Sequence, residues 1–150
     1  MSLDRETELN LASDAPAAAD FLAGRGGRLH TPADGEPGIW WAEMHPAVDA
    51  EETYVARIGW SVYPSAPPSI KFATAVGGSI EHPSAWPMIS GYRPSSLDIC
   101  KPFTSEGYAL HPDWSGTNQA WTGEGNPFVA VVQELQRDLN SPSYSGRHQP

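Results

Sequence analysis

Basic residues are scarce in this chain. Lysine and arginine number 9 against 18 aspartate and glutamate residues, which gives a formal net charge of −9 at pH 7. Arg25 and Arg28 come nearest to a basic cluster, and two glycines separate them. Proteins that bind nucleic acid or anionic membranes carry basic patches, because contacts to phosphate groups supply much of their affinity. The composition therefore predicts neither a nucleic-acid partner nor a membrane partner.

Long apolar runs, a secretion signal and cysteine pairs are also missing. No apolar run approaches the roughly 18 residues that a membrane-spanning helix needs. The first six residues lack the basic start and the apolar stretch of a secretion signal. Cys100 is the single cysteine, so it cannot form a disulfide within the chain and it fits a reducing compartment. We expect a cytoplasmic protein.

The usual motifs for metals, cofactors and hydrolytic catalysis are absent. His45, His82 and His111 each precede a proline, and the sequence has no His-x-His or Cys-x-x-Cys pair with metal-ligand spacing. It has no Gly-x-Gly-x-x-Gly, no phosphate-binding loop and no Gly-x-Ser-x-Gly. We therefore expect no metal and no cofactor.

The residues that are present predict one domain with helices and strands. Hydrophobic residues make up 39% of the 150 residues, which is enough to bury a core. The 14 glycines and 15 prolines predict many turns and argue against a mostly helical protein. We assign residues 1–142 to a single domain and residues 143–150 to a C-terminal tail.

The N-terminal region has a loose helical spacing of apolar residues between Glu6 and Leu22, which Pro16 interrupts. Either a helix begins near Asp14, as its cap, with Pro16 in the first turn, or the helix is broken at Pro16. Glycines at positions 24, 26 and 27 end it. Residues 29–38, which contain two prolines and two glycines, are predicted to form a loop.

Three segments have the composition and alternation of β-strands, namely residues 39–44, 53–63 and 69–74. In the second segment, one face carries the residues that we expect to be buried: Tyr54, Ala56, Ile58, Trp60 and Val62. The short connections between the three segments predict an antiparallel meander.

The rest of the chain divides into a long loop and a helix. Residues 76–125 contain repeated prolines, and we expect them to be mostly irregular but packed through their aromatic residues. Residues 126–139 predict a helix with Asn126 as its cap and Pro127 in its first position. The predicted fold class is α+β, an antiparallel β-meander packed against an N-terminal helix and a C-terminal helix, with a long proline-rich loop.

The connection between the second and third strands resembles that of a known family. Residues 63–72 read Tyr-Pro-Ser-Ala-Pro-Pro-Ser-Ile-Lys-Phe. This run resembles the Tyr-Pro-x-x-Pro-Pro-x-(Ile/Val)-x-Phe signature of the ubiquitin-conjugating (E2) enzymes. Residues 98–100, Asp-Ile-Cys, resemble the Ile-Cys step that carries the catalytic cysteine of that family, and residues 127–142 are similar to its crossover helix and the turn after it. The resemblance covers residues 39–142 and implies a UBC-like fold in a divergent member of bacterial type.

The same resemblance leaves one match open. The family has a tryptophan after its catalytic cysteine, and two residues of this chain fit. Trp114 is followed by serine, as in the family, whereas Trp121 has the better spacing to the C-terminal helix.

Cys100 is the candidate nucleophile. By resemblance it would accept a ubiquitin-like protein as a thioester, a reaction that needs an exposed thiol. The neighbouring Lys101 would help to stabilise the thiolate, and Asp98 would oppose that effect. The other interpretation is a buried structural cysteine, because free cysteine is among the most buried residue types.

Three further residues are candidates for supporting roles. His82 and Ser84, separated by Pro83, resemble a remnant of the His-Pro-Asn element that precedes the cysteine in the family, with Ser84 in place of Asn. Asp113 would act as a base for an incoming lysine. The other interpretation of each segment is an ordinary loop.

Two functions follow from the resemblance, and a third interpretation does without it. The first is a carrier that receives a ubiquitin-like protein on Cys100 from an activating enzyme, which consumes the ATP, and passes it to an amine. The second is a non-catalytic protein-binding module with the same fold, which the serine in place of Asn favours. The third is an unrelated α+β domain in which the Pro-Pro turn arose by chance.

Overall fold

The computed structural model describes residues 3–33 and 36–149 of the chain. Its main sheet is an antiparallel meander in which each strand pairs with the next one along the chain. The strands, in spatial as well as chain order, are β1 (Arg28–His30), β2 (Ile39–Met44), β3 (Tyr54–Gly59) and β4 (Ser69–Ala73).

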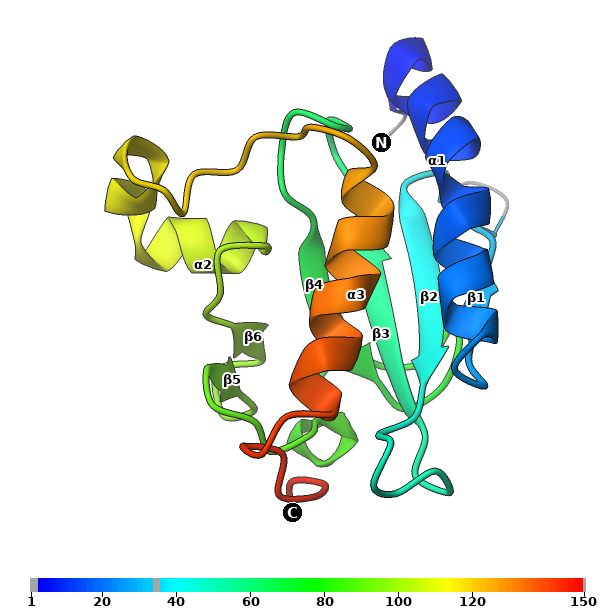
Figure 1. The fold of residues 1–150 in the computed structure, drawn as a ribbon, viewed down its shortest axis with the longest axis vertical. Helices are drawn as coiled ribbons and strands as arrows, with labels where there is room; N and C mark the ends of the chain where they lie inside the picture. The colour runs from blue at the N-terminus through cyan, green and yellow to red at the C-terminus, as the bar shows by residue number, and fades with distance from the viewer. Residues whose placement is uncertain (1–2, 34–35, 150) are drawn as a thin grey trace.

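The two long helices, α1 (Arg5–Ala23) and α3 (Pro127–Leu139), cover one face of this sheet. Figure 1 shows α1 in front of β1 and β2, with α3 beside it toward β4. The register places Trp40 opposite Ile58 and Ile58 opposite Ile70, so these side chains form a row in the core beneath the helices. The predicted α+β class, with an antiparallel sheet packed against helices, is confirmed.

Helix α1 is longer than the sequence predicts. It runs without a break through Pro16, so both a start near Asp14 and a break at Pro16 are wrong. Proline removes one helical hydrogen bond and destabilises a helix interior. On either side of Pro16, the side chains of Leu11 and Leu22 are buried in the main core, and each residue is exposed by 1% or less. Tertiary packing of this face therefore outweighs the local cost of the proline.

The cap of α1 is Asp4 rather than Asp14. The Asp4 carboxylate accepts the backbone N–H of Thr7 at 2.9 Å, and this bond lowers the pKa of the Asp4 carboxyl. Asp14 lies inside the helix, where its carboxylate accepts the hydroxyl of Tyr63 at 2.5 Å. The same hydroxyl accepts the backbone N–H of Phe128 at 3.2 Å, so the tyrosine joins α1 to α3.

Strand β1 occupies residues that the sequence predicts as a loop from residue 29 onward, and that prediction is wrong at residues 29 and 30. Arg28 pairs with Glu43 and His30 pairs with Trp41 on β2. A ring nitrogen of His30 lies 2.5 Å from the Glu43 carboxylate, and Leu29 packs against the main core. A strand of three residues has too little alternation to be distinguished from a loop by pattern alone.

Strand β3 ends at Gly59, earlier than predicted. Four of the five residues expected to be buried are in the core: Tyr54, Ala56, Ile58 and Trp60. Val62 is 48% exposed, so its predicted burial is wrong, whereas Tyr63 is only 2% exposed. Residues 61–66 form bends and turns, and alternation between two faces holds only within a strand.

Helix α3 matches its prediction. Asn126 caps it by accepting the N–H of Val129, and Pro127 is the first helical residue. Its inner side chains are each 0% exposed, namely Phe128, Val131, Val132, Leu135 and Leu139. The Phe128 ring packs edge-on against that of Trp40, with centroids 5.3 Å apart, so this helix closes the core over β2.

Residues 74–126, which we call the loop region, lie beyond β4 at one edge of the sheet (Figure 1). As predicted, they are mostly irregular but packed, and Trp86 is 0% exposed. They contain only short elements: the 3₁₀ turns η1 (Pro83–Ala85) and η2 (Pro112–Gly116), the paired strands β5 (Tyr92–Arg93) and β6 (Asp98–Ile99), and helix α2 (Ser105–Leu110).

The described part of the C-terminal tail packs against the rest of the domain. Tyr144 contacts the main core, and Arg147 forms an antiparallel bridge with Pro87 of the loop region. The tail is thus ordered by contacts with residues that are distant in the sequence.

Candidate functional site around Cys100

Cys100 lies directly after β6, on the loop that leads to α2, and its side chain is half-buried rather than part of the core. Its backbone N–H donates to the carbonyl oxygen of Gly91 at 2.8 Å, which extends the β5–β6 pairing by one bond. The backbone at Cys100 is therefore fixed while the residue remains partly exposed, and partial exposure is typical of reactive cysteines.

Gly91 has a backbone conformation that favours glycine. Its φ angle is +87°, in the region that favours glycine, and an added Cβ would lie 2.7 Å from Cε of Lys101. The lysine stem thus lies against the backbone that accepts the Cys100 hydrogen bond. This contact fixes the lysine beside the cysteine.

The charged end of Lys101 is directed to a carboxylate of α3. Its ammonium nitrogen lies 3.7 Å from Oδ1 of Asp138, whose residue is only 9% exposed. The hydroxyl of Tyr92 donates to Oδ2 of the same carboxylate at 2.8 Å. Burial and the neighbouring carboxylate raise the Tyr92 pKa well above its usual value, so this hydroxyl stays a donor. The expected partnership of Lys101 with a thiolate therefore competes with an ion pair that anchors the loop to α3.

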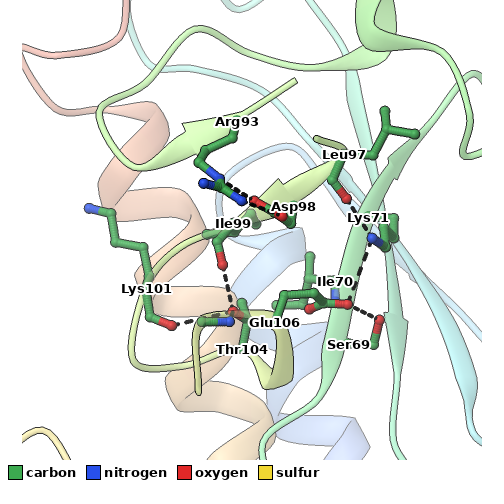
Figure 2. A network of polar contacts seen from close by, with 11 residues as sticks. Ser69, Ile70, Lys71, Arg93, Leu97, Asp98, Ile99, Lys101, Thr104 and Glu106 are labelled. Atoms are coloured by element: carbon green, nitrogen blue, oxygen red, sulfur yellow. Dashed lines mark hydrogen bonds and ion pairs between the residues drawn. The ribbon is translucent and has the colours of Figure 1, made fainter. Parts of the chain in front are cut away.

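Asp98, which we expected to oppose a thiolate, is neutralised by Arg93. The guanidinium donates two hydrogen bonds to the carboxylate, at 2.7 and 2.9 Å, across the β5–β6 pair. Figure 2 shows this bidentate pair beside Ile99. The pair raises the pKa of Arg93, chiefly through its hydrogen bond with Asp98. Paired ions of opposite sign leave little net charge next to the cysteine.

Thr104 closes the Cys100 loop onto α2. It is fully buried, and its hydroxyl donates to the Ile99 carbonyl at 2.7 Å and accepts the N–H of Gly107 at 2.9 Å. The second bond makes Thr104 the N-cap of α2. Figure 2 places this hydroxyl between the carbonyl oxygens of Ile99 and Lys101. One side chain therefore contacts the backbone on both sides of Cys100.

Glu106 joins α2 to the edge of the main sheet. Its carboxylate accepts the Ser69 hydroxyl and, at 3.3 Å, the N–H of Ile70 (Figure 2). The Lys71 ammonium lies 3.9 Å from the same carboxylate and donates to the carbonyl of Leu97 at 2.5 Å. These contacts hold both ends of the segment that carries Cys100 against β4.

The other three candidate residues lie elsewhere. His82 and Ser84 lie at η1, where His82 is exposed and the Ser84 carbonyl accepts a hydrogen bond from Arg147 at 3.2 Å. In Figure 1 this green turn lies at the lower end of the view, away from the β6–α2 loop. Within residues 3–33 and 36–149, no hydrogen bond or ion pair joins either residue to Cys100.

Asp113 is exposed in η2, beyond α2 from the Cys100 loop (Figure 1). The ring of His111 stacks on that of Trp114 in the same turn, with centroids 4.5 Å apart. Of the two tryptophans left open by the sequence, Trp114 lies in this turn. The indole N–H of Trp121 donates to the Pro64 carbonyl at 2.9 Å, in the proline-rich connection after β3. The structure thus directs the charged ends of Lys101 and Asp98 to Asp138 and Arg93, and it places Asp113 beyond α2.

A shallow cleft of about 400 Å³ lies between that proline-rich connection and α2. Its walls combine aromatic surface with hydroxyl groups and include Pro67, Ser105, Tyr108 and Trp121. The Tyr108 hydroxyl donates to the Gln119 carbonyl, which fixes the outer wall. Of the residues in this lining, Tyr108 and Trp121 are of the aromatic types that are enriched at protein interfaces.

Tyr92, Asp138, Thr104 and Glu106 form part of the site, and sequence reasoning did not identify them. Thr104 carries a usable signal, because a threonine before Ser-Glu is typical of a helix N-terminus. The other three acquire their roles from partners that are remote in the sequence, and no local pattern predicts such contacts.

Within the part of the chain that the structure describes, no group of three or more His, Cys, Asp or Glu side chains could hold a metal ion. Among the same residues, no helix has the length and apolar character to cross a membrane. Comparison with family models, with curated proteins and with solved structures yields no match.

Proposed function

We propose that this protein carries a ubiquitin-like protein as a thioester on Cys100 and passes it to an amine. The observation that carries the proposal is a half-exposed cysteine on a loop whose backbone is fixed by Gly91 and Thr104. The resemblance of residues 39–142 to the ubiquitin-conjugating enzymes, including their UBC-like fold, supplies the chemistry. The single cysteine fits a reducing compartment such as the cytoplasm.

The chemistry consists of two acyl transfers. In the first, the Cys100 thiolate attacks the thioester that joins the cargo to its activating enzyme, a new C–S bond forms, and the enzyme's cysteine leaves as a thiolate. In the second, an amine attacks the Cys100 thioester, an amide bond forms, and Cys100 leaves as a thiolate while the amine loses its proton. The chain needs no cofactor for either step, because the activating enzyme has already consumed the ATP.

A non-catalytic protein-binding module is the second candidate function. It is favoured by the positions of the three supporting candidates. His82 and Ser84 lie at η1 and Asp113 lies in η2, away from the loop that carries Cys100. The cleft beside Trp121 gives such a module a surface for its partner. For such a module, partner binding would depend on the cleft and would not require Cys100.

An adduct experiment separates the two functions. The purified chain is incubated with ATP and lysate of its source organism, and the products are analysed on a non-reducing gel. We expect a higher-mass adduct that reductant removes, because a thioester is sensitive to thiols. With Cys100→Ser the adduct is an ester and survives reductant, and with Cys100→Ala it does not form.

Any thiol-sensitive adduct must be on Cys100, because the chain has no other cysteine. If no adduct forms in a lysate that charges another conjugating enzyme, the carrier function is wrong. The same result with Cys100→Ala as with the natural chain would likewise overturn it. Omission of ATP is the matched control, since loading depends on the activating enzyme.

A further inference from the structure

Residues 143–149, which we call the strap, lie along residues 86–88 of the loop region and form one antiparallel bridge with them. The N–H of Met88 donates to the Gly146 carbonyl at 2.8 Å, and the N–H of Ser145 donates to the Met88 carbonyl at 3.0 Å. The N–H of His148 donates to the Trp86 carbonyl at 2.9 Å. Apart from Gly146, whose φ is +106°, these contacts follow the antiparallel pattern by which a peptide binds along a backbone edge.

The side chain of Arg147 occupies a cage of acceptors. Its guanidinium donates to the Glu52 carboxylate at 2.5 Å, to the Thr53 carbonyl at 2.7 Å and to the Ser84 carbonyl at 3.2 Å. It also lies 4.5 Å from the centre of the Tyr54 ring, in a cation–π contact. A planar group with several donors is needed to satisfy all four partners, so the cage is specific for arginine.

Tyr144 provides a second anchor, three residues before Arg147. Its ring packs edge-on against that of Tyr54, with centroids 6.1 Å apart, and the two hydroxyls lie 2.9 Å from each other. Both anchors therefore contact Tyr54 at the start of β3. Between them, the backbone of the strap is left to pair with residues 86–88.

The surroundings favour a positively charged peptide. The connection from β2 to β3 carries Asp49, Glu51 and Glu52 within four positions, in a chain with a net charge of −9. The Arg147 hydrogen bond holds the pKa of the Glu52 carboxyl below its usual value, so this carboxylate stays charged. The strap follows α3 after only the turn at residues 140–142, and no covalent link other than the chain itself holds it in place.

We propose that residues 52–54 and 84–88, which contact the strap and which we call the strap site, form a recognition site for peptides that carry an arginine, and that the strap is its resident ligand. An arginine-bearing segment of a partner protein binds there by displacing the strap. The strap acts as a tethered competitor, and a short tether gives it an effective concentration of about millimolar. The site therefore responds to partners that bind more tightly than the strap does.

Displacement bears on Cys100 through the loop that the strap covers. Residues 86–88 lead within three positions to Gly91, whose carbonyl accepts the Cys100 N–H. A peptide bound at the strap site would keep these backbone contacts, whereas an empty strap site would lose them. This regulatory consequence rests on the carrier function proposed above, but peptide recognition itself does not.

The test uses the full chain and a labelled peptide with the strap sequence, Ser-Tyr-Ser-Gly-Arg-His-Gln. In the variant Arg147→Gln the tethered strap loses its arginine, so the cage is free for the peptide. By fluorescence anisotropy we expect the peptide to bind this variant about tenfold more tightly than it binds the natural chain. The same peptide with glutamine in place of arginine should bind neither protein.

Arg137→Gln is the matched control, because Arg137 is 72% exposed on α3 and pairs only with Glu134 in its own helix. This variant should bind the peptide as the natural chain does. Equal binding of the peptide to Arg147→Gln and Arg137→Gln would overturn the proposal, and so would equal binding of the arginine and glutamine peptides.

A measurement on the natural chain covers the case in which Arg147→Gln fails to fold. Excess peptide should speed hydrogen exchange at the amides of Ser145 and His148, which the displaced strap exposes, while Met88 stays protected by the incoming peptide. Unchanged exchange at Ser145 and His148 would contradict the proposal. Neither experiment depends on an adduct at Cys100. Failure of the peptide-recognition proposal can therefore be distinguished from failure of the carrier function.

Discussion

Two regions of this molecule share one apolar core but differ in their regular structure and in how far polar contacts anchor them. Where α1 and α3 cover the main sheet, the core consists of interlocking apolar side chains, and the α3 residues that face it are fully buried. In the loop region, the strands have two residues each and the only α-helix has six. Trp86, Ile99 and Phe103 of this region reach the same core, and charged pairs and single hydroxyl groups add polar anchors to β4 and α3.

The difference explains why the candidate chemistry lies in the loop region. Apolar burial fixes the helices and the sheet but leaves no group free to react. A few polar anchors fix the backbone at Cys100 while the residue stays half-buried rather than part of the core. Reactive residues are commonly carried on loops that a rigid scaffold positions. Substitutions in the two regions should therefore have different consequences, which the following predictions order by size.

The largest expected effect is in the apolar region. Phe128→Ala removes a ring that is 0% exposed and packs edge-on against Trp40. We expect the free energy of unfolding to fall by about 3–5 kcal/mol, as for other buried phenylalanines. Denaturant unfolding measures this loss. Leu110→Ala, at a 44% exposed residue of α2, is the control and should change little. Similar losses in both variants would remove the contrast between the regions.

Tyr92→Phe tests the polar anchor between the loop region and α3. It leaves the ring in place but removes the hydroxyl that donates to the buried Asp138 carboxylate. We expect a loss of about 1–3 kcal/mol, because a buried carboxylate is left with fewer donors. Tyr108→Phe is the matched control, since that hydroxyl bonds an exposed carbonyl. An unfolding curve for Tyr92→Phe that overlays the natural one would show that the anchor is not needed.

Thr104→Val tests the closure of the Cys100 loop. The substitution keeps the shape of the side chain but removes the cap of α2 and the bond to the Ile99 carbonyl. We expect a loss of about 0.5–2 kcal/mol and faster hydrogen exchange at the Gly107 amide. Thr117→Val, in the exposed turn η2, should alter neither quantity. Unchanged exchange at Gly107 would mean that α2 holds without its cap.

The smallest effect concerns the strap and is measured as a loss of stability on acidification. The pKa of Glu52 is lowered in the folded protein, chiefly by its hydrogen bond with Arg147. A lowered carboxyl pKa adds stability above its unfolded value of 4.5, and this is lost as the pH falls through the folded value. Between about pH 6 and pH 3, the natural chain should therefore lose more unfolding free energy than Glu52→Gln. Parallel pH profiles of the two proteins would contradict this.

The sequence predicts the apolar region better than the loop region. The helix at residues 127–139 is recognised by its cap, its first proline and its apolar stripe, all of which are local. Pro16 misleads, because its local cost is offset by burial of Leu11 and Leu22 against residues far along the chain. Val62 misleads for a related reason, since an alternating pattern continues after the strand has ended at Gly59.

In the site itself, only Cys100 and its immediate neighbours could be selected from the sequence. The roles of Asp138 and Glu106 depend on Tyr92 and Ser69, which are brought to them by the fold. His82 and Asp113 were selected because each follows or precedes a proline in a suggestive motif. The structure separates both from Cys100, because η1 is bonded to the strap and η2 lies beyond α2.

The most direct measurement on Cys100 is the rate at which a thiol reagent modifies it across a denaturant series. Only one thiol is present, so the rate refers to this residue alone. For a half-exposed cysteine on a fixed loop, we predict a rate that stays constant below the unfolding transition, because the thiol reacts from the folded protein. A rate that is negligible without denaturant and rises in step with global unfolding would make Cys100 a structural residue and contradict the carrier function.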